Sequence, residues 1–289
     1  MKIFLTGHTG FIGSELYSLL KYSHFSVISL ERDDLKTKDS IHDFFKLHHA
    51  NSDDLLIHLA CVGVNTAASL EDCLKFNLLT SLNLCNVACE FGIAKYIFTG
   101  SCFEYGLSGN TINFLDEDSN LLPTGSYATS KVISYYALKE LFSNKNAVIA
   151  YLRLFQVYGE SESENRLFPS LLKAAKSGSD FEMSDGEQIR DFIHVSHVIN
   201  YIFRLIENFQ LYSNFNIFNV CSGVPTSVKD FANYHWARVN ARGKIFFGRK
   251  NRKNEFARIV GTTNKIDNAK IVPFIAFYGF FCIVRTLNV

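Results

Sequence analysis

The sequence predicts an α/β fold in which a doubly wound, mostly parallel sheet carries a smaller second domain. Short apolar runs typical of strands alternate with longer runs typical of helices through the first half of the chain. A glycine-rich turn follows the first run, and 289 residues are enough for a large domain with a smaller one attached. Right-handed crossovers join strands that alternate with helices, so these strands are expected to lie parallel.

The sheet domain is expected to span residues 1–159. Its predicted strands are 2–6, 25–30, 55–60, 96–99 and 147–152. Its predicted helices are 11–20, 40–48, 70–91 and 126–142. The strand runs are short and apolar and the helix runs are longer, which is the basis of the assignment.

After Gly159 the alternation loosens, and the second domain is expected to be small and discontinuous. Residues 190–195 predict a strand that leads into a helix, so segment 190–215 is expected to return to the sheet domain. The remainder of residues 160–289 is assigned mainly to the second domain. Further predicted elements are helices at 168–177 and 195–207, a strand near 215–220 and a helix after Ser227.

The composition excludes several classes of protein. Charged residues make up 20% of the chain and the net charge is +1, so we expect neither disorder nor a nucleic-acid partner. The 7 cysteines are odd in number and contain no C-x-x-C pair, which argues against a disulfide framework and against a metal site. A reducing, cytoplasmic location fits this cysteine content best.

No targeting or membrane-spanning segment is expected. The chain passes from Met1 and Lys2 directly into the first strand, without the apolar core and cleavage site of a signal peptide. The apolar run 271–284 is shorter than the about 20 residues that cross a bilayer, and Pro273 interrupts it. We therefore expect this run to be packed or to form an interface, and we assign it no chemistry.

The glycine-rich turn has the spacing G-x-x-G-x-x-G and lies between the first predicted strand and helix. Glycines allow the backbone to approach a pyrophosphate, whose charge then faces the N-terminus of the helix. This context predicts a Rossmann-type dinucleotide site, and a turn without a ligand is the alternative. The turn residues expected to bind the cofactor are Gly7, Thr9, Gly10, Phe11, Ile12 and Gly13.

Glu31 and Arg32 end the second predicted strand. In Rossmann folds, a carboxylate about 20 residues past the turn binds the adenosine ribose hydroxyls. Glu31 lies close to that position, which favours NAD. Arg32 could instead neutralise the 2′-phosphate of NADP, and both residues could be a solvated strand end. The choice between NAD and NADP stays open.

Tyr127 and Lys131 lie about one helical turn apart on the predicted helix 126–142. A nearby ammonium stabilises a phenolate and lowers the pKa of tyrosine, which gives an acid–base group suited to carbonyl and alcohol chemistry. The same spacing is common on surface helices. Its position after the fourth strand unit favours the catalytic interpretation.

These motifs resemble those of the extended short-chain dehydrogenase/reductases, the family of NAD(P)-dependent nucleotide-sugar epimerases, dehydratases and reductases, from residue 1 to about 266. The segment 97–106 resembles the family strand that ends in a catalytic hydroxyl, which implies that Ser101 is the third catalytic residue beside Tyr127 and Lys131. The resemblance also implies further cofactor contacts, namely Leu59, Ala60, Asn77, Tyr127 and Lys131.

Three later segments resemble the family's substrate site, which implies a nucleotide-diphosphate sugar as the partner. They are 153–159, the segment 185–195 whose arginine holds the diphosphate, and a late R-x-x-E at 252–255. Such an arginine fork suits phosphate, although a lone arginine such as Arg190 could be an ordinary surface charge. The candidate substrate residues are Ser101, Cys102, Phe103, Gln156, Arg190, Arg252 and Glu255.

Several positions depart from the family pattern. Cys102 and Phe103 occupy the places where the 4,6-dehydratases carry an Asp-Glu pair, so dehydration is not expected. Glu104 replaces a usual apolar residue, and the pattern does not say whether it faces the site. Gln156 replaces the usual asparagine, and His197 stands where an aspartate is common and is interpreted as structural.

Segments 101–106 and 186–192 resemble those of the family's reductases that act in the synthesis of bacterial surface polysaccharides such as the O-antigen of lipopolysaccharide. This resemblance implies the NAD(P)H-dependent reduction of a nucleotide-diphosphate 4-keto-6-deoxyhexose. A 4-epimerase is the alternative, because it uses the same three residues. A more distant alternative is a cofactor-sensing protein without catalysis, whose Ser/Tyr/Lys set would be broken, whereas here it is intact. The resemblance suggests a homodimer through helices 70–91 and 126–142 and leaves the base, the sugar and the C4 stereochemistry open.

Overall fold

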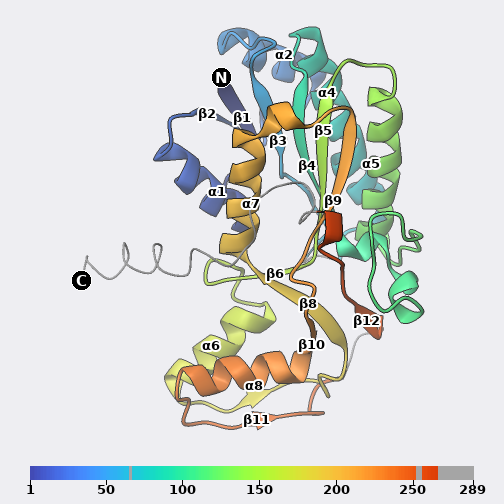
Figure 1. Ribbon diagram of the computed structural model, residues 1–289. Coiled ribbons are helices and arrows are strands. Elements are labelled where there is room, and N and C mark those ends of the chain that lie inside the picture. The colour runs from blue at the N-terminus through green and yellow to red at the C-terminus, as the bar shows by residue number, and fades with distance from the viewer. Residues whose placement is uncertain (65–66, 252–255, 266–289) are drawn as a thin grey trace.

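The computed structural model describes residues 1–64, 67–251 and 256–265. Figure 1 shows a sheet flanked by helices above a smaller lobe. The sheet has 6 parallel strands in the order β2-β1-β3-β4-β5-β9. This arrangement confirms the predicted doubly wound α/β fold. The strands are β1 (Lys2–Thr6), β2 (Ser26–Leu30), β3 (Leu55–His58), β4 (Lys95–Ser101), β5 (Val148–Leu154) and β9 (Phe215–Val220).

Helices cover both faces of this sheet because alternate strand residues point to opposite sides. In β1, Ile3 and Leu5 belong to the core beneath α1 and α7, whereas Phe4 belongs to the core beneath α2, α4 and α5. The covering helices are α1 (Phe11–Lys21) and α7 (Val195–Glu207) on one face, and α2 (Lys38–Leu47), α4 (Ser81–Glu90) and α5 (Ser126–Phe142) on the other.

The long helix expected at 70–91 consists of three successive segments. A π-helical turn, η1 (Lys75–Thr80), separates α3 (Leu70–Leu74) from α4. π-helical turns are rare and often occur at functional sites. This one contains Asn77, a predicted cofactor residue, and its side chain is buried.

The smaller lobe contains a sheet in which β8 pairs with β6, β10 and β12, and a separate pair of β7 and β11. Helices α6 and α8 pack beside these strands (Figure 1). Its elements are β6 (Gln156–Tyr158), α6 (Leu167–Ser177), β7 (Phe181–Glu182), β8 (Ile189–His194), β10 (Pro225–Ser227), α8 (Val228–Arg238), β11 (Ile245–Phe246) and β12 (Arg258–Ile259). Short helical turns complete the chain, namely η2 (Cys102–Glu104), η3 (Leu107–Asn110) and η4 (Phe209–Leu211).

The chain crosses between the two layers more than once. β8 belongs to the smaller sheet, whereas α7 packs on α1 and β9 joins the main sheet. The segment in the main layer therefore runs from residue 195 to 220, rather than over the expected 190–215. The shift arises because β8 pairs with β6 instead of extending the main sheet.

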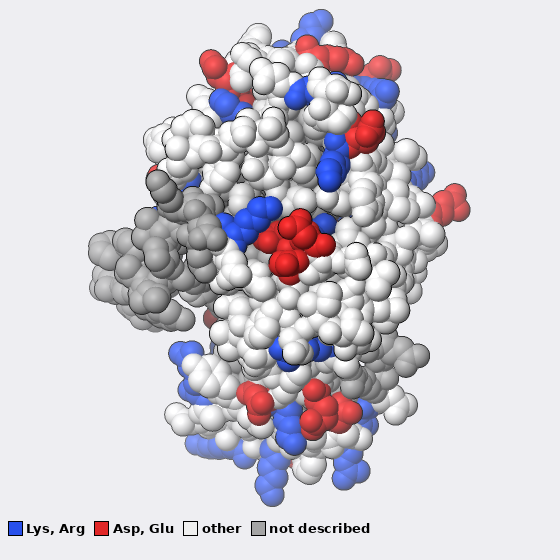
Figure 2. All heavy atoms as spheres, turned by 45° about the vertical axis from the view of Figure 1, so that its right-hand side comes forward, with Lys and Arg blue, Asp and Glu red and all other residues white. Residues whose placement is uncertain are grey.

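The surface of the described residues carries charges of both signs. Figure 2 shows basic and acidic side chains interspersed on one face of the molecule, in keeping with the net charge of +1. Among the described helices, none has the length and apolar character that crossing a membrane requires. The apolar run 271–284 lies outside the described residues.

Candidate active site

The glycine turn connects β1 to α1 through a backbone that leaves no room for side chains. Gly7 has φ +74°, a conformation that favours glycine, and its carbonyl accepts the Gly10 N–H at 3.0 Å. A Cβ on Gly13 would lie 1.9 Å from the same carbonyl oxygen. These contacts bring the N-terminus of α1 against the turn, where its free N–H groups can receive a phosphate.

The turn opens into a cavity of about 670 Å³ at the carboxyl ends of β1, β3 and β4. Strand order reverses between β1 and β3, and open α/β sheets bind ligands at such a point. All predicted cofactor residues except Asn77 and Lys131 line this cavity. The glycine turn and the shape of the cavity therefore fit a dinucleotide.

His8 is a cavity residue that the sequence analysis missed. Its Nε2 lies 3.2 Å from a carboxylate oxygen of Glu31, and its ring packs on Tyr17. Its buried Nδ1 has no hydrogen-bond partner among the described residues. Its place inside the glycine turn was the only signal in the sequence.

Tyr127 lies in the first turn of α5 and lines the cavity beside Ser101 from the end of β4. Ser101 acts on the Tyr127 hydroxyl by lowering its pKa, although other causes outweigh this effect. Lys131 follows one turn later, with its Nζ 6.0 Å from the centre of the Tyr127 ring. The structure thus brings together the three predicted catalytic residues.

The ionisation of Tyr127 differs from the expected one. Burial raises the pKa of Tyr127 well above its ordinary value, and Cys61 and Glu104 act in the same direction. The Lys131 ammonium donates to the Thr99 carbonyl at 2.8 Å. The net pKa of Tyr127 is therefore raised rather than lowered as expected, because burial is the largest cause. Tyr127 is therefore protonated at neutral pH.

Asn77 lies behind the cavity wall, where it joins that wall to α5. Its amide exchanges two hydrogen bonds with the backbone of Val62, at 2.8 and 3.0 Å. Its Nδ2 also donates to Ser130 Oγ at 2.9 Å, and Ser130 in turn donates to the Tyr127 carbonyl at 2.8 Å. The side chain of Asn77 therefore supports the turn of α5 that carries the catalytic tyrosine.

His58 is a buried neutral link between β1 and the long helix. Its ring nitrogens lie 2.7 Å from Thr6 Oγ1 and 2.8 Å from Ser81 Oγ. Burial, together with the charge of Lys131, lowers the pKa of His58 to about 3. His58 is therefore not a proton carrier at neutral pH, and its role is structural.

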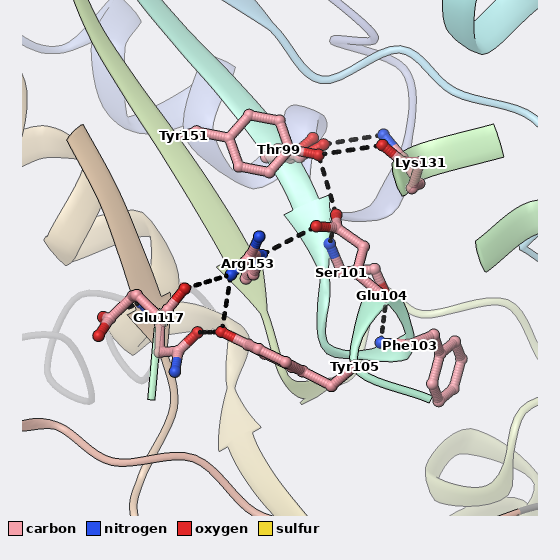
Figure 3. A network of polar contacts seen from close by, with 10 residues as sticks. Thr99, Ser101, Phe103, Glu104, Tyr105, Glu117, Lys131, Tyr151 and Arg153 are labelled. Carbon is pink, nitrogen blue, oxygen red and sulfur yellow. Dashed lines mark hydrogen bonds and ion pairs between the residues drawn. The ribbon is translucent and has the colours of Figure 1, made fainter. Parts of the chain in front are cut away.

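Glu104 is not among the residues that line the cavity, and its buried side chain belongs to a network of polar contacts (Figure 3). One carboxylate oxygen accepts the Ser101 N–H at 2.8 Å and the Tyr151 hydroxyl at 2.9 Å. The other accepts Nε of Arg153 at 2.9 Å. Arg153 continues the network, because its Nη1 donates to the Tyr105 hydroxyl at 3.0 Å.

The predicted substrate residues occupy different places. Ser101, Cys102, Phe103 and Gln156 line the cavity. Arg190 is buried on β8 and is not among the lining residues. The predicted substrate residues Arg252 and Glu255 lie outside the described residues.

Arg166 and Glu162 are further lining residues that the sequence analysis missed. The Arg166 Nε donates to Glu162 at 2.9 Å. The polar segment 160–166 between β6 and α6 was the only signal for them. With Glu31 and Arg32, this pair makes up the carboxylate and guanidinium side chains that line the cavity within the described residues.

Cys102 cannot replace the acid of a dehydratase. Burial raises the pKa of its thiol to about 12, so the thiol is a far weaker acid than the carboxyl group of an aspartate. The neighbouring Phe103 packs against Phe256 with ring centres 5.9 Å apart. Within the described residues, no cluster of His, Cys, Asp and Glu could hold a metal ion.

Comparisons with known proteins identify one family and related enzymes. A family model described as "NAD dependent epimerase/dehydratase family" matches residues 3–221. The chain is 27% identical over 251 residues to the CDP-abequose synthase of Salmonella typhimurium, covering 80% of this chain and 79% of that protein.

Two solved structures share the fold. RMD from Pseudomonas aeruginosa complexed with NADPH superposes with a TM-score of 0.81 at 23% identity, covering 93% of this chain and 91% of that one. The UDP-glucose 4-epimerase of Thermotoga maritima with UDP-glucose superposes with a TM-score of 0.80 at 21% identity. The match covers 93% of this chain and 92% of that one.

Proposed function

This chain belongs to the NAD dependent epimerase/dehydratase family, and on that premise we propose that it reduces a nucleotide-diphosphate 4-keto-6-deoxyhexose. The observation that carries the proposal is the position of Tyr127 and Ser101 in the wall of the same cavity into which the glycine turn opens. A carbonyl oxygen that receives a hydride at its carbon needs a proton donor of this kind. The similarity to CDP-abequose synthase supports the same class of sugar.

The proposed cofactor site follows the cavity from the glycine turn to Tyr127. The N–H groups at the start of α1 would hold the pyrophosphate, and Glu31 and Arg32 lie where the adenosine ribose would end. Bound NADH or NADPH would supply the hydride to C4 of the sugar. Tyr127 would donate the proton to the C4 oxygen, and Ser101 would orient that oxygen by a hydrogen bond.

Reduction is favoured over the other reactions of the family by the residues around the tyrosine. Dehydration needs an acid and a base, and neither the weakly acidic thiol of Cys102 nor the ring of Phe103 provides one. Epimerisation begins with removal of a proton from the C4 hydroxyl, so Tyr127 would have to start as phenolate. Its raised pKa disfavours that form. A 4-epimerase remains the second candidate, because it would use the same residues.

The proposed partner is a nucleotide-diphosphate sugar destined for a bacterial surface polysaccharide such as the O-antigen. The proposed contacts of its nucleotide and diphosphate are Arg190, Arg252 and Glu255. They rest on the family resemblance alone, because Arg190 is buried outside the cavity lining and the other two lie outside the described residues. A cytoplasmic homodimer is part of the proposal. Exposed apolar side chains on the face of η1 and α5 support such an interface, namely Leu79, Ile133 and Tyr136.

A spectrophotometric assay tests the proposed reaction. Purified protein is mixed with NADH or NADPH and with CDP- or dTDP-4-keto-6-deoxyglucose, and the reduced cofactor is followed by its absorbance. We expect stoichiometric oxidation of one cofactor with one of these sugars. Oxidation with none of them would overturn the reductase proposal, and turnover of a UDP-hexose without net cofactor change would favour the epimerase.

A further inference from the structure

We propose that Glu104, held by Arg153, is a positioning residue that fixes Ser101 and places a negative charge behind the Tyr127 hydroxyl. The inference rests on the proposed reduction, because it assigns Glu104 a task in presenting the proton donor. Glu104 is fully buried and is not among the residues that line the cavity. Its effect on the reaction is therefore indirect, through Ser101 and Tyr127.

The end of β4 is held at two successive points. The Glu104 carboxylate accepts the backbone N–H of Ser101 at 2.8 Å, while Ser101 Oγ accepts the N–H of Phe103 at 3.2 Å. This reciprocal pair is a capping box on η2, and it restrains the Ser101 side chain. Two residues earlier, the Thr99 carbonyl accepts from Lys131 at 2.8 Å. The backbone that carries Ser101 is thus held by Glu104 and by Lys131.

The Glu104 carboxylate is paired rather than solvated. Arg153 donates to it at 2.9 Å, and the two side chains are 1% and 0% exposed. The Tyr151 hydroxyl donates to the oxygen that also binds Ser101. Figure 3 shows these donors converging on the carboxylate from β4 and β5. A buried ion pair stabilises a protein little more than an apolar pair of similar volume. We therefore infer that this pair matters for its electrostatic effect on the neighbouring Ser101 and Tyr127.

The charge of Glu104 also affects the ionisation of Tyr127. Burial is the largest cause of the raised pKa of Tyr127, and Cys61 and Glu104 add to it. Lys131, whose Nζ lies 6.0 Å from the centre of the Tyr127 ring, carries the opposite charge to Glu104. The titratable and polar groups near Tyr127 come from several elements packed around it. They are Cys61 after β3, Ser101 and Cys102 at the end of β4, Glu104 of η2, Lys131 of α5 and Tyr151 of β5. The carboxylate therefore favours the neutral phenol, the form that donates a proton.

The test uses Glu104→Gln, which keeps an oxygen acceptor for Ser101 and removes the charge. The variant phenol should ionise at lower pH than the wild-type phenol, because the phenolate no longer faces a carboxylate. The near-ultraviolet phenolate band of the cofactor-free protein reports this, after subtraction of the same protein carrying Tyr127→Phe. In assays, the alkaline limb of the kcat profile should move to lower pH while KM stays unchanged.

Two further variants separate this effect from loss of stability. Asp54→Asn changes a buried acid that binds Lys2 at the far end of the sheet, and it should leave the alkaline limb in place. The double variant Glu104→Gln/Arg153→Met removes both charges, so it should recover thermal stability relative to Arg153→Met and retain the lowered phenol ionisation. It also replaces Glu104→Gln if that single variant does not fold.

The outcomes are distinct from those of the reductase test. An unchanged phenol titration in both Glu104 variants would overturn the inference about charge, whatever the substrate. A protein that oxidises no cofactor with any keto-sugar would overturn the proposed function, while the titration, which needs no substrate, would still decide the role of Glu104.

Discussion

The Tyr127→Phe variant is expected to lose about 10²–10⁴-fold in kcat, the range that a positioned general acid contributes. The change removes only the phenolic oxygen and its proton. Lys131 keeps its contact with the Thr99 carbonyl, and the ring keeps its place in the cavity wall. Binding of NADH or NADPH should therefore change little. Steady-state kinetics and a fluorescence titration of the cofactor measure the two effects separately.

Tyr136→Phe is the matched control for this variant. Tyr136 lies on the same helix α5, but its side chain is 56% exposed. Its hydroxyl has no role in the proposed reaction, so kcat should equal that of the wild type. A Tyr127→Phe protein with wild-type kcat would contradict the assignment of the proton donor.

The Arg153→Met variant is expected to lower the free energy of unfolding by about 3–5 kcal/mol, the cost of leaving one partner of a buried ion pair unpaired. Glu104 would remain in a site without solvent, with only the Ser101 N–H and the Tyr151 hydroxyl as donors. The Tyr105 hydroxyl would also lose its contact with the guanidinium. The melting temperature should fall by on the order of 10 °C. Thermal and urea unfolding measure both quantities.

An exposed ion pair provides the comparison for Arg153. Lys173 and Glu164 approach to 2.8 Å, but both side chains are exposed to solvent. Lys173→Met should leave stability unchanged, because water screens such pairs. A loss for Arg153→Met as small as that for Lys173→Met would mean that the network under the active site does not depend on its charge pair.

The sheet domain was predictable because its signals are local. The strands β1 to β4 are short apolar runs, and a helical segment follows each of them along the chain. The glycine turn and the Tyr127–Lys131 spacing are also local. Their positions along the strand–helix alternation were enough to place them at one edge of the sheet.

The rest depends on contacts between distant parts of the chain. Glu104 meets Arg153 and Tyr151 only because β4 and β5 are neighbours, and no spacing in the sequence reports the direction of its side chain. The same holds for the pair of His8 and Glu31. The pKa of Tyr127 was predicted with the wrong sign, because burial was not visible from the motif.

The strands of the smaller lobe were harder to predict from the sequence for a different reason. β10, β11 and β12 have only two or three residues each, too few for a periodic pattern. β8 was recognised as a strand, but its partner β6 was not, so its sheet was assigned incorrectly. Arg252 and Glu255 remain predictions from the family resemblance.

Transfer of deuterium from the cofactor tests the reductase proposal most directly. NADH or NADPH that carries deuterium at its transferable position is incubated with CDP- or dTDP-4-keto-6-deoxyglucose, and the product sugar is examined by mass spectrometry and NMR. The account predicts a single deuterium at C4 for each cofactor oxidised, and none when Tyr127→Phe replaces the wild type over the same time. A sugar product without deuterium at C4 would contradict it.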